Sequence, residues 1–137
     1  IGEEKVNPNY QDSESLPELY DQLFKYIPNL KMVATTLRYS LSASHQQIGG
    51  VLYDREKLYN AEVRDVTPVV DRVGSGDAFM GGLIYGLLNK DFNKQQILDF
   101  AVAACCLKHT IFGDYNLSTI DEVENMAKGN LTGKVSR

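Results

Sequence analysis

The chain has 137 residues, of which 43% are hydrophobic and 23% are charged, and its formal net charge is −4. This length and composition are typical of a single folded domain and exclude a disordered chain. The acidic balance argues against DNA or RNA as a partner, because nucleic-acid binding favours a basic face.

The N-terminal part of the chain predicts an irregular lead-in followed by a helix. Residues 1–12 are polar, and the first residue is Ile rather than Met, so we expect this chain to be part of a longer protein. Ser15-Leu16-Pro17-Glu18 is typical of a helix start, with Ser15 as the capping residue. A helical apolar stripe follows and ends before Pro28; its members are Leu16, Leu19, Leu23 and Ile27.

The middle of the chain predicts β-strands. Met32–Leu37 is apolar and partly β-branched, which is typical of a buried strand. Residues 38–47 form a polar stretch to which no strand is assigned. Val51–Tyr53 and Lys57–Val63 have the pattern of two strands joined by a short hairpin turn. Residues 66–70 then lead into a glycine-rich loop.

Helices are predicted to close the chain, over Ala78–Leu88, about Lys94–Lys108, and Ile120–Lys128. Thr119 and Glu122 have the spacing of a capping box at the start of the last helix, and Gly129 is its stop signal. The strands and helices together predict an α/β fold.

Two features bear on the setting in which the protein works. Cys105 and Cys106 are adjacent and cannot join distant parts of the chain, and no Cys/His spacing suits zinc. We therefore expect a reducing, cytoplasmic setting. The apolar run Ile97–Leu107 is too short to span a bilayer and carries Asp99, so no membrane partner is expected.

The glycine-rich loop at residues 71–77 carries the strongest chemical signal. Gly74 and Gly76 flank Ser75, so the backbone can bend sharply and approach a ligand closely. A helix follows, and its first free N–H groups favour an anion such as phosphate. Asp77 would repel a resting phosphate but could accept a proton from a hydroxyl, which is the chemistry of a small-alcohol kinase. The alternative is a turn in which Asp77 only caps the helix.

The segment Val70–Leu88 resembles the C-terminal signature of the ribokinase-like (PfkB) carbohydrate kinases, Asp-Thr-x-Gly-Ala/Ser-Gly-Asp, with Arg72 where many members carry Thr. Phe100–Asp114 is similar to a late signature stretch of one branch, the 2-keto-3-deoxygluconate kinases. The resemblance runs from about Ile27 to the end. It implies the C-terminal portion of a doubly wound sheet with flanking helices, in which residues 13–137 are a nucleotide-binding portion without the N-terminal part and the lid.

This resemblance implies an ATP- and Mg²⁺-dependent kinase that phosphorylates a small sugar acid, with 2-keto-3-deoxygluconate converted to its 6-phosphate. Asp77 would contact the substrate and serve as the base, and an anion hole would come from the N–H groups of Gly74, Ser75, Gly76 and Asp77. No metal ligand is assigned within the chain. A fructokinase- or ribokinase-type enzyme and a non-catalytic nucleotide-binding fragment remain alternatives. The oligomeric state stays open, a homo-oligomer included.

The resemblance also implies roles for residues outside the loop, each with a plainer alternative. Asp114 would bond a substrate hydroxyl, or be an ordinary turn residue. Cys105 would line the adenine pocket, or be a small core residue. Arg38, at the end of the predicted strand, would reach nucleotide phosphates, or be a surface arginine. Asp71 would help hold a monovalent cation, or bond its own turn.

Overall fold

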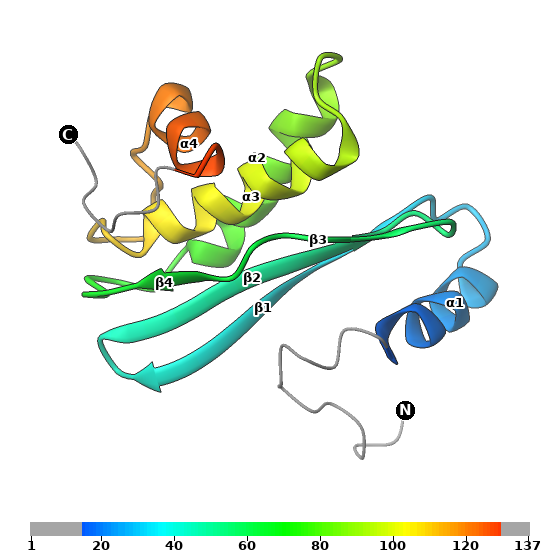
Figure 1. The fold of residues 1–137 in the computed structure, drawn as a ribbon, viewed down its shortest axis with the longest axis horizontal. Helices are drawn as coiled ribbons and strands as arrows, with labels where there is room; N and C mark the ends of the chain where they lie inside the picture. Colours follow the sequence, from blue (N-terminus) through cyan, green and yellow to red (C-terminus); the bar gives the residue numbers. More distant parts are fainter. Residues whose placement is uncertain (1–14, 130–137) are drawn as a thin grey trace.

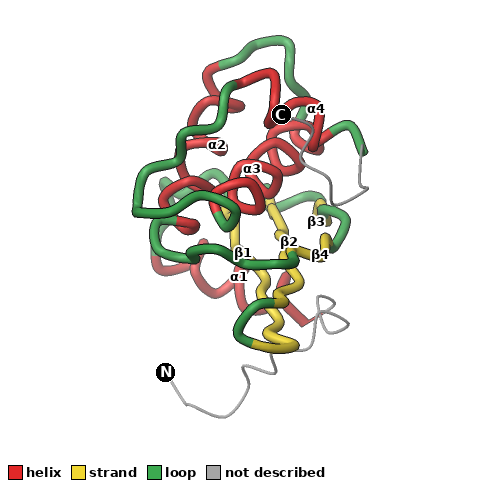
Figure 2. Tube along the Cα trace, turned by 90° about the vertical axis from the view of Figure 1, so that its left-hand side faces the viewer, coloured by secondary structure: helices red, strands yellow, loops and turns green. Residues whose placement is uncertain are grey.

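The computed structural model describes residues 15–129, so the predicted lead-in at residues 1–12 lies outside the described part (Figure 1). The elements are α1 (Leu16–Tyr26), β1 (Val33–Ser42), β2 (His45–Tyr53), β3 (Leu58–Asn60), β4 (Arg64–Val66), α2 (Ser75–Leu88), α3 (Lys94–Lys108) and α4 (Ile120–Ala127). The α/β fold class is confirmed. Helices α2, α3 and α4 lie on one side of the sheet and α1 on the other, as Figures 1 and 2 show.

Strand β2 is the centre of the sheet. β1 pairs antiparallel with it from Val33 opposite Tyr53 to Ser42 opposite His45. On its other edge, β2 pairs antiparallel with β4 near its start and with β3 near its end. All strand pairs among residues 15–129 are therefore antiparallel, and the parallel part of the expected doubly wound sheet is not represented there.

The long β1–β2 hairpin corrects the sequence prediction in one place. Residues 38–47, to which no strand was assigned, form the second half of β1, the turn and the start of β2. The second half of β1 is exposed, and an antiparallel strand with a solvent-facing side accepts polar residues without any apolar run. The predicted hairpin between Val51–Tyr53 and Lys57–Val63 is confirmed as β2–β3, with β3 shorter than expected.

The two faces of β2 are buried by different helices. Ile48 and Leu52 belong to the core that the sheet forms with α2 and α3. Val51 and Tyr53 belong to a second cluster with Tyr20 and Phe24 of α1. This division follows from the two-residue period of a strand, which sends alternate side chains to opposite faces.

Helix α1 buries a different face from the one predicted. Its buried residues are Tyr20 and Phe24, whereas Leu19, Leu23 and Ile27 of the predicted stripe are 47%, 37% and 51% exposed. The two aromatic rings bring more apolar surface to the sheet than the leucines, and the Tyr20 hydroxyl also donates to Thr35 Oγ1 at 2.8 Å. Ser15 occupies the N-cap position, but its side chain makes no capping hydrogen bond.

Helices α2, α3 and α4 form a layer over the sheet in which α3 is central. Gly82 and Gly86 allow α2 and α3 to approach closely, because neither has a side chain at the contact. A Cβ on Gly82 would lie 2.9 Å from Ala101 Cα, and one on Gly86 would lie 3.1 Å from Ile97 Cα. The predicted bounds of α3 and the Thr119–Glu122 capping box of α4 are confirmed. Arg64 donates to the carbonyls of the last turn of α4 and ties it to the sheet.

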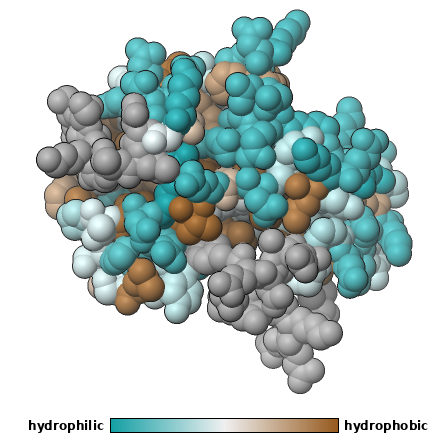
Figure 3. All heavy atoms as spheres, viewed as in Figure 1, coloured by the Kyte–Doolittle hydropathy of each residue, from teal (hydrophilic) through white to brown (hydrophobic). Residues whose placement is uncertain are grey.

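The visible surface is mostly polar. Figure 3 shows hydrophilic residues over most of this face, with smaller hydrophobic areas between them. No helix within residues 15–129 combines the length and the apolar character needed to cross a membrane.

Candidate active site

The glycine turn that precedes α2 is fixed by its neighbours. Gly74 has φ +76°, and a Cβ there would lie 2.0 Å from the backbone oxygen of Asp114. The Asp71 carboxylate accepts hydrogen bonds from the N–H groups of Val73 at 2.9 Å and Gly113 at 3.0 Å. These bonds, that of Val73 first, lower the pKa of Asp71. The turn interpretation of Asp71 is confirmed, and the residue also joins the glycine turn to the loop that carries Asp114.

Helix α2 begins at Ser75 rather than at Ala78, which changes the position of Asp77. Gly74 is the N-cap residue, and Asp77 lies in the first turn of the helix, where its side chain makes no hydrogen bond with any described residue. The alternative in which Asp77 serves only as the N-cap is therefore wrong. Its carboxylate is exposed and available to a ligand.

The backbone N–H groups of this first turn differ in their availability. The Ser75 N–H donates to the Arg72 carbonyl at 3.2 Å. The N–H groups of Gly74, Gly76 and Asp77 make no hydrogen bond with any described residue. A Cβ on Gly76 would meet no atom within 4 Å, so open space lies beside these donors. The turn thus has the geometry of an anion site at a helix N-terminus, with three of the four predicted donors free.

Arg38 reaches this turn from the middle of β1, where it pairs with Ile48, and not from the end of a strand as predicted. Its Nη2 donates to the Ser75 hydroxyl oxygen at 2.7 Å. The prediction misplaced it because the hairpin continues β1 to Ser42. Arg38 therefore supports the first residue of α2, and its contact with nucleotide phosphates stays a prediction.

Cys105 lies in the hydrophobic core behind the same turn and is 1% exposed. Burial raises the pKa of its thiol to about 11, against the opposing effects of Arg38 and Ser75. It does not line the cavity that Asp77 and Asp114 share. Its role at the adenine pocket stays a prediction.

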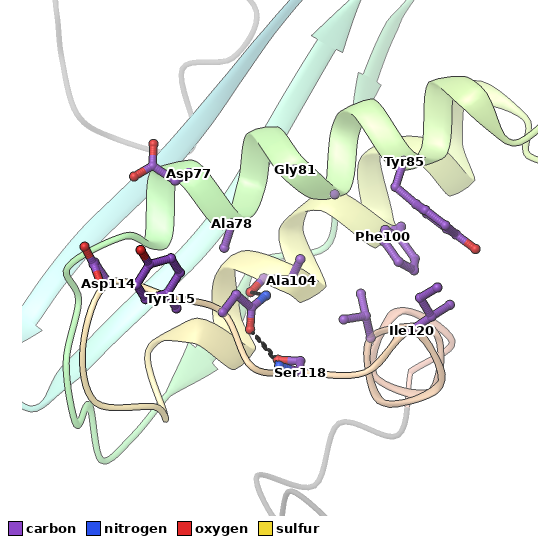
Figure 4. A pocket seen from close by; sticks show the side chains of 13 residues that line it. Asp77, Ala78, Gly81, Tyr85, Phe100, Ala104, Asp114, Tyr115, Ser118 and Ile120 are labelled. Atoms are coloured by element: carbon purple, nitrogen blue, oxygen red, sulfur yellow. Dashed lines mark hydrogen bonds between the residues drawn. The ribbon is translucent and has the colours of Figure 1, made fainter.

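A cavity of about 350 Å³ opens beside the start of α2. Figure 4 shows Asp77, Asp114 and Tyr115 at one end, and Tyr85, Phe100 and Ile120 at the other. The cavity therefore has an acidic, exposed end next to the free N–H groups and an aromatic end between helices. Its lining residues are Asp77, Ala78, Gly81, Gly82, Tyr85, Phe100, Ala104, Asp114, Tyr115, Asn116, Ser118, Ile120 and Val123.

Sequence reasoning identified Asp114 but missed the other cavity residues of the loop between α3 and α4, which are Tyr115, Asn116 and Ser118. Asn116 Oδ1 accepts the Ser118 N–H at 3.1 Å, which shapes this part of the wall. The loop could have been delimited from the end of α3 and the capping box at Thr119. Its contact with the glycine turn could not, because it depends on the close approach of Gly74 to Asp114.

Residues 15–129 contain no group of three or more His, Cys, Asp or Glu side chains that could hold a metal ion. Magnesium in ATP-dependent sites is held largely by phosphate oxygens and water, with one or two carboxylates.

Comparison with known proteins places this chain in a family. The model of the pfkB family carbohydrate kinases matches residues 47–120, which include both the glycine turn and the Asp114 loop. A 2-dehydro-3-deoxygalactonokinase of Haloferax volcanii is 36% identical over 85 residues, which cover 62% of this chain and 24% of that protein.

Solved structures agree with this assignment. A 2-dehydro-3-deoxygluconokinase of Thermotoga maritima superposes with a TM-score of 0.80 and 36% identity, over 88% of this chain and 36% of that one. A PfkB family carbohydrate kinase of Listeria grayi gives a TM-score of 0.77 and 29% identity, over 93% of this chain and 36% of that one. The chain thus spans about a quarter to a third of these relatives, and it belongs to the pfkB family of carbohydrate kinases.

Proposed function

We propose that the protein containing this chain transfers the γ-phosphoryl group of ATP to a hydroxyl group of 2-keto-3-deoxygluconate, giving its 6-phosphate. The observation that carries this proposal is the unbonded Asp77 carboxylate beside the free N–H groups of Gly74 and Gly76, at the acidic end of the cavity. The names of the relatives, a 2-dehydro-3-deoxygluconokinase and a 2-dehydro-3-deoxygalactonokinase, support a sugar acid of this class.

In this proposal, Asp77 is the general base. It accepts the proton of the substrate hydroxyl as that oxygen attacks the γ-phosphorus, and the bond between the γ-phosphorus and the β–γ bridging oxygen breaks to release ADP. Because the Asp77 carboxylate accepts no hydrogen bond from the described residues, its oxygens are available to accept this proton. Asp114, at the same end of the cavity, is proposed to orient the sugar acid by accepting a hydrogen bond from another hydroxyl.

The first turn of α2 supplies the electrostatic part of the reaction. Negative charge spreads over the phosphoryl oxygens in the transition state, and preorganised N–H donors stabilise it there. The positive end of the helix dipole acts in the same direction. Magnesium, carried by the nucleotide, would neutralise further phosphate charge. The cavity beyond Ala78 leads away from this turn toward Tyr85 and Phe100, and we assign it to the nucleotide.

The test is Asp77→Asn in the complete protein, with phosphorylated product measured by mass spectrometry and ATP binding by calorimetry. We expect kcat to fall by about 10²–10⁴-fold, because this is the usual contribution of a general base. ATP affinity should change little, since the amide leaves the backbone donors in place. Asp91→Asn, at an exposed carboxylate in the α2–α3 loop, is the control and should keep full activity. Near-normal turnover of the Asp77→Asn variant would contradict the assignment of the base.

A panel of acceptors separates the proposed substrate from the alternatives within the family. The complete protein is offered 2-keto-3-deoxygluconate, 2-keto-3-deoxygalactonate, fructose and ribose at equal concentrations. We expect the highest kcat/KM for the first. A preference for fructose or ribose would favour the fructokinase- or ribokinase-type alternative.

A further inference from the structure

Lys108, the last residue of α3, is fully buried and plays no part in the proposed chemistry. Its exposed fraction is 0%. Its ammonium group donates to the carbonyl oxygen of Ile111 at 2.8 Å and to that of Asp71 at 3.4 Å. No carboxylate among the described residues forms an ion pair with it. Burying a charge is unfavourable unless polar groups replace its water, and here two backbone carbonyls do so.

The two carbonyls belong to the two loops that form the acidic end of the cavity. Asp71 opens the glycine turn, and Ile111 lies shortly before Gly113 and Asp114. The same loops are joined by the bond from the Gly113 N–H to the Asp71 carboxylate. Lys108 thus adds a positive charge at a junction that already fixes the relative position of the two loops.

The C-terminal end of α3 also makes backbone hydrogen bonds at this junction. The carbonyl oxygen of His109 accepts hydrogen bonds from the N–H groups of Val70 at 2.8 Å and Asp71 at 3.2 Å. The backbone before the glycine turn is therefore anchored to the residue after Lys108. The side chain of Lys108 adds its hydrogen bonds to Asp71 and Ile111, so the C-terminal end of α3 contacts both the glycine turn and the 111–114 loop.

A side chain without hydrogen-bond donors could not replace this arrangement. Carbonyl oxygens that lose their donor inside the protein retain the full penalty of lost hydration. Two carbonyl dipoles directed at one cation are also the type of environment that binds a small monovalent ion. The ammonium group of Lys108 occupies that position while attached to the chain.

We propose that Lys108 is a positioning residue: its ammonium group acts as a built-in monovalent cation that holds the glycine turn against the 111–114 loop and thereby sets Asp77 opposite Asp114. This inference rests on the proposed function for its effect on turnover. Its effect on the two loops does not require any catalysis.

The first experiment compares Lys108→Ala with Lys128→Met in the complete protein. Lys128 is an exposed lysine, 73% accessible, so its variant controls for the loss of one positive charge. We expect Lys108→Ala to lower kcat by about 100-fold, because displacement of catalytic groups by about 1 Å has effects of this size. The KM for ATP should stay within about threefold, and the control should match the wild type.

Chemical rescue distinguishes positioning from general support of the fold. Truncation to Ala leaves room for a free ion between the carbonyls, so ammonium chloride should restore at least about tenfold of the lost kcat. Tetramethylammonium chloride at equal ionic strength should restore nothing, because the ion is too large and lacks N–H donors. The proposal would be overturned if the variant only had a smaller fraction of folded protein, while kcat per folded molecule stayed normal and ammonium had no effect. If Lys108→Ala does not fold, Lys108→Met is used, and normal turnover in that variant overturns the proposal equally.

Hydrogen exchange separates a failure of this inference from a failure of the proposed function. The amides of Val73 and Gly113 both bond the Asp71 carboxylate, so their exchange reports the junction without turnover. If these amides exchange faster in Lys108→Ala and ammonium reverses the change, the inference is supported. This holds even if the wild type phosphorylates no acceptor, a result that would refute only the proposed function. An active wild type whose Lys108→Ala variant keeps both its turnover and its amide protection refutes only the inference.

Discussion

At the scale of single residues, the glycines of the turn are glycine for two different reasons. Gly74 has a left-handed backbone and lies against the Asp114 carbonyl, so the fold itself requires it. Gly76 lies in the first turn of α2, and a Cβ at its position would have no atom within 4 Å. The fold does not require a glycine there. The open space beside the free N–H groups instead suits the close approach of a ligand.

These two glycines give a paired prediction. Gly76→Ala should keep or raise the free energy of unfolding, by up to about 1 kcal/mol, since Ala favours a helix over Gly. Turnover should nevertheless fall, because the methyl group would occupy the space beside the phosphoryl group. Gly74→Ala should lower stability by at least about 1–2 kcal/mol through left-handed strain, in addition to its contact with Asp114. Denaturant unfolding and steady-state kinetics measure both effects. Unchanged turnover in a stable Gly76→Ala protein would contradict the anion site.

At the scale of elements, the close packing of β2 against α3 depends on Gly50. A Cβ there would lie 2.8 Å from Val102 Cγ2 and 3.3 Å from Leu98 Cδ1. Gly50→Ala should therefore destabilise the protein by about 1–3 kcal/mol through overpacking. The double variant Gly50→Ala/Val102→Ala removes the nearest atom and should recover part of that loss in a double-mutant cycle. Additive losses in the double variant would show that contact with Val102 is not the cause.

A second link between elements joins the β2–β3 turn to the start of α3. The Asp54 carboxylate is paired with the Lys94 ammonium and accepts the Lys57 N–H at 2.8 Å. These bonds, that of Lys94 first, lower the pKa of Asp54 to about 2. A carboxyl whose pKa is lower in the folded than in the unfolded state stabilises the fold above its unfolded pKa of about 3.9. This contribution is lost as pH falls toward the folded value.

The corresponding measurement is the unfolding free energy of the wild type and of Asp54→Asn between pH 2 and pH 6. The wild type should be more stable at pH 5–6, and its advantage should diminish between about pH 4 and about pH 2. Asp121→Asn, at an exposed carboxylate that forms no ion pair with any residue of the 15–129 range, should show no comparable change in that window. An advantage independent of pH would mean that the ion pair does not set the acid response.

The sequence predicted those elements whose signals are local. α3 and α4 follow from helical runs, and α4 also from its capping box at Thr119 and Glu122. The β2–β3 turn follows from two short strands with a polar connection. β1 was predicted too short because its second half is a polar, exposed edge with no apolar run. The face of α1 was wrong because Tyr20 and Phe24 are selected by Tyr53 on the sheet, a contact distant in sequence.

In the candidate site, too, the sequence predicted local features and missed those that depend on tertiary contacts. The turn, its glycines and Asp77 were identified from one continuous motif. Other parts of the site join residues far apart in the chain, and no local pattern indicates them. They are the hydrogen bond from Arg38 to Ser75, the one from Lys108 to Asp71, and the cavity wall at Asn116. What sequence alone predicts is the chemistry of the motif. The positions of its partners follow from tertiary contacts.

At the scale of the whole molecule, the chain spans about a third of the solved kinases it resembles, and the described cavity is lined by residues of three helices and one loop of this chain. Helices α2, α3 and α4 and the loop before α4 provide all of its lining residues. The sugar acid, by contrast, has only Asp77 and Asp114 as proposed contacts in this chain. Binding of the two substrates should therefore depend differently on the rest of the protein.

This difference can be measured by titrating the 137-residue chain and the complete protein with ATP–Mg²⁺ and with 2-keto-3-deoxygluconate. We expect the chain to bind ATP, to show no measurable binding of the sugar acid and to produce no phosphorylated product, whereas the complete protein does all three. Circular dichroism establishes that the isolated chain is folded before the titration. A folded chain that fails to bind ATP would contradict the assignment of the cavity to the nucleotide. Turnover by the chain alone would show that the acceptor site, too, lies within these residues, because phosphoryl transfer requires both substrates to be held in line.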